Sequence, residues 1–124
     1  MIEYTVRVLK DRTEWYNKQG QFHRIDGPAD EYKNGNKFWW LNGQRHRIDG
    51  PAVEYKNGDK FWWLNGQRHR EDGPAFEWAN GSKAWWLNGK EYTEEEFIAK
   101  TQPVKELTVA EIEKLLGYAI KVVK

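Results

Sequence analysis

Three histidines recur, each with an arginine directly after it and an aspartate two residues beyond that arginine. The string HRIDGPADEYKNG begins at His23, and close copies begin at His46 and His69. A histidine steered by a carboxylate is an arrangement used for general-base catalysis, and three histidines are a ligand set for zinc. The pattern therefore poses a choice between a catalytic motif, a metal site and the joint of a repeated scaffold.

The chain repeats itself with a period of 23 residues. The units span 14–36, 37–59 and 60–82, a partial unit follows at 83–92, and all of them align without a gap. A period of roughly 20–50 residues is typical of stacked arrays, whose terminal units differ from the inner ones. We therefore expect an N-terminal strand or cap (1–13), a repeat region (14–92) and a helical C-terminal cap (93–124).

The dipeptide Asn-Gly punctuates every unit, at 34, 42, 57, 65, 80 and 88. Between apolar runs this dipeptide is typical of a type I′ hairpin turn, because both residues tolerate positive φ. Asp-Gly-Pro then has to bend the chain between two extended pieces. The sequence predicts a mainly β fold, an antiparallel meander of tandem 23-residue β-hairpin repeats, with no helix inside the repeats.

Spacing and symmetry decide how the histidine motif is interpreted. If each unit adds two strands at about 4.8 Å, equivalent histidines lie roughly 10 Å apart, whereas the ligands of one zinc ion sit about 2 Å from it. A catalytic site needs a unique constellation, yet every copy here carries the same one. We therefore predict no enzyme, no catalytic residue, no metal ligand and no cofactor.

The alternative is a joint between units. In it the aspartates accept backbone N–H groups at the bend, and the arginines pair with these aspartates or with those of the next unit. The residues assigned to this joint are His23, Arg24, Asp26, His46, Arg47, Asp49, His69, Arg70 and Asp72.

Tryptophan pairs give the repeated strands aromatic side chains on both faces, because successive residues of a strand point to opposite sides. Either Trp40, Trp63 and Trp86 stack on one another from unit to unit, or one aromatic stripe stays open for a partner. An arginine row accompanies them, and it changes to Phe22 and Glu91 in the terminal units. The candidate partner-binding residues are Trp39, Trp40, Trp62, Trp63, Trp85, Trp86, Arg45 and Arg68.

The repeat also carries a family resemblance. The string WWLNGQRHRIDGPAVEYKNG at 39–58, with its copies over 14–92, resembles MORN-related repeats in the variant with an HRxDGPA signature, found in proteins of bacteriophages, large viruses and some bacteria. The resemblance implies an extended antiparallel sheet that serves binding and scaffolding. It also implies a phage accessory factor that binds and inhibits a host protein, such as a component of a defence system.

Composition limits the other classes of function. Twenty basic and nineteen acidic residues give a net charge of +1, so no basic footprint for nucleic acid emerges. The chain has no cysteine, no apolar signal segment at its start and no apolar stretch long enough to cross a membrane, so we expect a cytoplasmic protein.

Two further hypotheses stay open. One is a self-associating structural subunit or homo-oligomer. The other is a nucleic-acid or nucleotide binder that stacks bases on tryptophans beside arginines, namely Trp39, Trp62 or Trp85 with Arg45, Arg47, Arg68 and Arg70.

The C-terminal segment predicts two short helices. Thr93 with Glu96 forms a capping box, the same device recurs in LTVAEI, and the helices are expected over about 94–101 and 109–116. Residues 118–123 are predicted to form a strand, with 2–9 as its candidate partner. One repeat position reads Asp30, Val53 and Phe76, which places Phe76 under a helix. A helix-turn-helix is disfavoured, since only seven residues follow the last turn.

Overall fold

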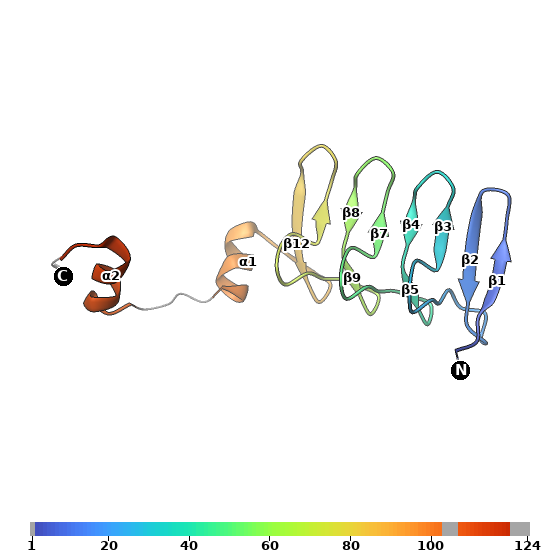
Figure 1. Cartoon of the computed structure of the whole chain (residues 1–124), viewed down its shortest axis with the longest axis horizontal. Helices are drawn as coiled ribbons and strands as arrows, with labels where there is room; N and C mark the ends of the chain where they lie inside the picture. Colours follow the sequence, from blue (N-terminus) through green and yellow to red (C-terminus); the bar gives the residue numbers. More distant parts are fainter. Residues whose placement is uncertain (1, 103–106, 120–124) are drawn as a thin grey trace.

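The computed structural model describes residues 2–102 and 107–119 and shows a mainly β fold (Figure 1). Within these residues thirteen strands form antiparallel sheets, and two helices follow them. The main sheet has nine strands, in the spatial order β1 (Thr5–Val8), β2 (Arg12–Tyr16), β3 (Asp30–Tyr32), β4 (Lys37–Phe38), β7 (Val53–Glu54), β8 (Lys60–Phe61), β11 (Phe76–Glu77), β12 (Lys83–Leu87) and β13 (Lys90–Tyr92). Spatial order follows chain order, which confirms the predicted meander.

The four remaining strands form two small hairpins below the main sheet (Figure 1). They are β5 (Trp40–Leu41) with β6 (Gln44–Arg45), and β9 (Trp63–Leu64) with β10 (Gln67–Arg68). In the second unit β4 and β5 are two halves of one extended segment that meet at Trp39. The N–H of Trp39 donates to the carbonyl of Ala52 at 2.7 Å, and its carbonyl accepts the N–H of His46 at 3.2 Å. The segment therefore pairs with β3 and β7 above this residue and with β6 below it.

The six Asn-Gly turns fall into two kinds. Asn42, Asn65 and Asn88 have φ of 49–50° and are followed by glycines at 78–81°, as a type I′ turn requires. At 34, 57 and 80 only the glycine has positive φ. There the prediction of type I′ was wrong, because the loop has three residues: in the first copy the N–H of Tyr32 donates to the carbonyl of Asn36, and the N–H of Gly35 donates to the carbonyl of Tyr32. This pattern is a type I turn that ends in a bulge at glycine.

The first unit contains one extra residue. Trp15 donates its N–H to Ala29, as Trp39 does to Ala52, so these tryptophans are structural counterparts although they lie 24 positions apart. The gapless alignment was therefore wrong in this unit, and Glu14 corresponds to Phe38. The insertion lies in the first lower turn, whose loop of residues 18–20 is one residue longer than the two-residue loop of the next unit. Strand β2 begins at Arg12 and so spans the boundary predicted between 13 and 14.

Few of the described side chains are fully buried, because no second sheet formed by the described residues packs against the main sheet. The buried apolar residues are Ala29, Ala52, Val53, Ala75 and Phe97. The three alanines occupy the same repeat position, at the end of each Asp-Gly-Pro bend, where their carbonyls accept the N–H groups of Trp15, Trp39 and Trp62 at 2.7 Å. Much of the remaining packing comes from aromatic rings in contact along the sheet, such as Phe38 with Tyr55 at 5.6 Å between ring centroids.

Two helices follow the sheet with the bounds that the sequence predicted. They are α1 (Glu94–Thr101) and α2 (Val109–Leu116), and each begins at a complete capping box, Thr93 with Glu96 and Thr108 with Glu111. Helix α1 packs against β12 and β13 and buries Phe97, so it covers the C-terminal end of the sheet (Figure 1). Residues 118–119 lie outside any strand, and the rest of the strand predicted at 118–123 falls outside the described residues.

Candidate functional site

Each histidine of the repeated motif hydrogen-bonds to the next unit. The imidazole Nδ1 atoms of His23, His46 and His69 accept the backbone N–H groups of Asn42, Asn65 and Asn88 at 3.0, 2.9 and 2.9 Å. These asparagines are the first residues of the type I′ turns. A ring nitrogen that accepts this bond is not available to take a proton from a substrate.

Each arginine of the motif lies over a tryptophan of its own unit. The guanidinium carbons of Arg24, Arg47 and Arg70 lie 4.0, 3.9 and 3.9 Å from the ring centroids of Trp15, Trp39 and Trp62. Stacking of this kind stabilises a cation that has lost part of its hydration. We call the side of the sheet that carries these Trp-Arg pairs the joint face.

The same arginines also bind the bend of their own joint. In the second copy Arg47 donates through Nε to Asp49 at 3.1 Å and through Nη1 to the carbonyl of Pro51 at 3.1 Å and to Glu54 at 3.2 Å. The third copy repeats these contacts through Arg70, and its hydrogen bond lowers the pKa of Asp72. The arginine therefore pairs with the aspartate of its own joint.

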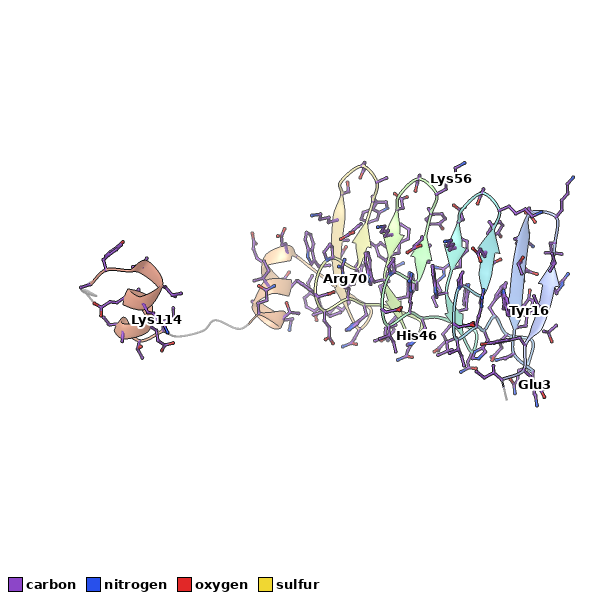
Figure 2. All side chains as sticks on the ribbon, viewed as in Figure 1. Glu3, Tyr16, His46, Lys56, Arg70 and Lys114 are labelled. Carbon is purple, nitrogen blue, oxygen red and sulfur yellow. The ribbon has the colours of Figure 1, made fainter. Side chains whose placement is uncertain are left out.

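The polar side chains of the joints contact their own unit and the next one. In the part of the chain that the structure describes, no three His, Asp or Glu side chains come together to hold a metal ion. The polar atoms of each joint instead bind one another in three equivalent sets. Figure 2 shows His46 and Arg70 on the body of the sheet, away from the hairpin tip that carries Lys56.

The predicted partner-binding residues do not form one surface. Trp39 and Trp62 lie on the joint face under their arginines, whereas Trp40, Trp63 and Trp86 lie on the opposite side, which we call the ladder face. All six tryptophans of the pairs, Trp85 included, are half-buried. Only the joint-face members can therefore belong to a site built on the repeated motif.

On the ladder face the tryptophans are separated by arginines. Arg45 lies between Trp40 and Trp63, at 5.3 and 5.2 Å from the ring centroids, and Arg68 lies between Trp63 and Trp86, at 5.5 and 4.6 Å. The expected direct stack of Trp40, Trp63 and Trp86 is thus an alternating stack of rings and guanidinium groups. Because both faces of Trp63 meet an arginine, it offers no open ring to a base.

Phe76 belongs to the same ladder face. Its ring contacts Phe61 at 4.6 Å and Trp78 at 5.5 Å, and the Arg68 guanidinium lies 5.3 Å from its centroid. The change from Asp30 through Val53 to Phe76 at this repeat position thus extends the aromatic packing within the sheet. Helix α1 packs on β12 and β13.

Two pockets open on the joint face between successive joints. The first has a volume of about 690 Å³ and lies between the first bend, which includes Gly27, and the side chains of Trp39, His46 and Ile48. The second, of about 730 Å³, is the same site one unit later, with Trp62, His69 and Glu71. At the rim of the first pocket Ile48 is 85% exposed. Its signal in the sequence was an isoleucine within an otherwise polar motif, and we did not single it out.

A buried acidic pair was also missed. Glu14 and Asp30 stand where the next unit has Phe38 and Val53, and they are only 5% and 9% exposed. Burial raises the pKa of Asp30, and the charge of Glu14 raises it further, whereas Arg12 lowers it. Arg12 lies 3.2 Å from Glu14 and 4.0 Å from Asp30. Because solvent barely reaches either carboxylate, the pair is a structural feature of the first unit.

Comparisons with known proteins add no assignment: no family model, no curated protein and no solved structure matches the chain. Among the described residues, neither helix has the length and apolar character needed to cross a bilayer. The candidate site therefore rests on the geometry of the joint face alone.

Proposed function

We propose that this chain is a non-enzymatic repeat scaffold that binds another protein through its joint face. The observation that carries the proposal is the pair of equivalent pockets between successive joints, each with a half-buried tryptophan and an exposed rim. A concave site with aromatic walls and a few polar groups is the usual form of a binding site. Its repetition along a stacked array creates the extended surface that repeat proteins use for partners.

The internal bonds of the joints support a binding role rather than a catalytic one. In each copy the histidine holds the next turn and the arginine holds its own bend. These contacts fix the walls of the pockets, so the pockets are preformed. A preformed site loses little side-chain entropy when a partner binds.

The partner proposed first is a host protein of an infected bacterium, which the scaffold binds and inhibits. This part rests on the resemblance of the repeats to those of phage proteins. The near-neutral charge favours a protein over a nucleic acid, since phosphate binding is driven by clustered basic residues.

Self-association is a second candidate, favoured by one observation. Strand β1 is the edge of the main sheet, all four of its residues are exposed, and Val6 and Val8 are 42% and 78% exposed. An exposed edge strand is a template for pairing with another chain. Light scattering over a range of concentrations distinguishes the two, because only self-association makes the apparent mass rise with concentration.

The proposed function is tested by affinity capture of a tagged chain from bacterial lysate, with and without nuclease. We expect a protein in stoichiometric amount that survives nuclease treatment. Material that absorbs at 260 nm and disappears with nuclease would instead support a nucleic-acid partner.

A further inference from the structure

The N-terminal segment places a tyrosine in the first joint. The ring of Tyr4 meets the ring of Trp15 edge to face, with 5.3 Å between centroids, and lies 6.1 Å from the ring of His23. Its hydroxyl oxygen accepts the backbone N–H of Ile25 at 3.0 Å. One aromatic side chain thus packs on the joint tryptophan and also satisfies a backbone donor of the motif.

The two open pockets are bounded instead by the bend of the preceding joint, which carries a glycine, Gly27 or Gly50. Val6 pairs with Trp15 in the register of β1 with β2. In the next unit the N–H of Ala29 donates to the carbonyl of Phe38 at 2.9 Å, beside the pair of Asp30 and Phe38. Two residues before Val6 is Tyr4, and two residues before Ala29 is Gly27. A repeat later the residue is again glycine, Gly50. A Cβ at Gly27 or Gly50 would lie 2.9 Å from the guanidinium carbon of Arg24 or Arg47, so these glycines leave room for the arginines of the joints.

The walls that receive Tyr4 are repeated in the first open pocket. Trp39, His46 and Ile48 are the counterparts of Trp15, His23 and Ile25. The N–H of Ile25 is bonded to Tyr4, whereas the N–H of Ile48 donates to no atom of the described residues. The exposed fractions of the two isoleucines agree with an unfilled site beside Ile48, since Ile25, next to Tyr4, is 59% exposed and Ile48 is 85% exposed.

We propose that the pocket beside Trp39 binds a tyrosine side chain of the partner protein. The ring packs against Trp39 and the hydroxyl oxygen accepts the N–H of Ile48, as Tyr4 does in the first joint. This inference rests on the proposed function, because it names the chemistry by which the joint face recognises a protein. Tyrosine fits such a site because its ring buries apolar area and its hydroxyl satisfies one polar group.

The second pocket is the weaker site. Glu71 stands in the place of Ile48, and its carboxylate lies 3.4 Å from Nε2 of His69. A charged group therefore replaces the apolar rim and engages the histidine. The substitution Glu71→Ile recreates the first pocket one unit later and is a matched gain-of-site variant.

The test uses the full chain labelled with ¹⁵N, titrated with N-acetyl-tyrosinamide and, separately, with N-acetyl-phenylalaninamide. We expect saturable shifts at the Ile48 amide and the Trp39 indole, with the tyrosine compound binding about fivefold more tightly, since one net hydrogen bond separates the two probes. Ile48→Glu should weaken binding at this pocket, and Glu71→Ile should add a second set of shifts at residue 71. A spectrum with native dispersion shows that each variant is folded.

Equal affinity for the two probes, or shifts confined to residues outside this pocket, would overturn the inference. These outcomes differ from a failure of the proposed function. If a protein is captured and its binding depends on Ile48, but the pocket shows no preference for tyrosinamide, the tyrosine assignment is wrong and the scaffold role stands. If tyrosinamide binds but no protein is captured, the scaffold role is wrong and the chemistry assigned to the pocket stands.

Discussion

The imidazole Nδ1 of His46 accepts the backbone N–H of Asn65 at 2.9 Å, so a side chain of one unit completes the turn of the next. The hydrogen-bond partner of this imidazole nitrogen is a backbone amide, not the hydroxyl or thiol of a nucleophile. The bond recurs at both other copies of the motif within 0.1 Å. The histidine that resembles a general base is therefore a tie between neighbouring units.

Replacing His46 with alanine should destabilise the fold by about 1–2 kcal/mol, because the N–H of Asn65 loses its acceptor. His46→Asn is the matched control, since the Asn side-chain oxygen can stand near the position of Nδ1 and should recover part of the loss. Chemical denaturation of both variants measures the difference. Equal stability of the alanine variant and the wild type would contradict the tie.

Arg47→Lys should cost more stability than Arg24→Lys, by about 0.5–1 kcal/mol. Both arginines stack on a tryptophan and bind an aspartate and a proline carbonyl, but only Arg47 also binds a glutamate, Glu54. Lysine keeps the charge and loses the planar fork that makes several bonds at once. Thermal unfolding of the two variants checks the order, and a larger loss at Arg24 would count against the account.

Asp30→Val should stabilise the protein at neutral pH by about 1–3 kcal/mol, the usual cost of a poorly satisfied buried polar group. Burial raises the pKa of Asp30 in the folded state, so its ionisation opposes folding at neutral pH and this penalty fades as the pH falls through the raised pKa. The advantage of the valine variant should therefore shrink in acid. Denaturation at neutral and acidic pH measures both values, and a gain that grows in acid would show that the sign is wrong.

Single-stranded oligonucleotide should bind weakly or not at all. Bases stack on open aromatic faces, but Trp39 and Trp62 carry Arg47 and Arg70, and on the ladder face Arg45 and Arg68 lie between the rings. Fluorescence anisotropy with a labelled oligonucleotide at low salt tests this. Tight binding that falls steeply with added salt would revive the nucleic-acid hypothesis.

Local signals predicted much of the fold. The capping boxes at Thr93 and Thr108 lie within four residues of sequence, so they set where α1 and α2 begin. The period of 23 residues and the Asn-Gly turns predicted the meander. The turn type was missed at 34, 57 and 80 because the same dipeptide suits loops of two or three residues, and cross-strand pairing decides which one forms.

The candidate site needed information that sequence patterns lack. Arg45 was placed on a binding surface because it varies in the terminal units, yet its Nε is buried between two tryptophans on the ladder face. Whether the odd-numbered or the even-numbered residues of a strand face the joints depends on the path of the bend, which the sequence pattern does not give. The counterpart of Trp39 in the first unit is Trp15, because that unit contains one extra residue, so a gapless alignment does not relate Tyr4 to the first pocket.

The most direct test of a binding joint face is affinity capture with two matched variants. Ile48→Asp places a charge at the rim of the first pocket, and Val8→Asp places the same charge on an equally open apolar residue of β1, since the two side chains are 85% and 78% exposed. The account predicts that the captured protein is lost with Ile48→Asp and retained with Val8→Asp. Capture that survives the change at Ile48, or that fails only with the change at Val8, would contradict it.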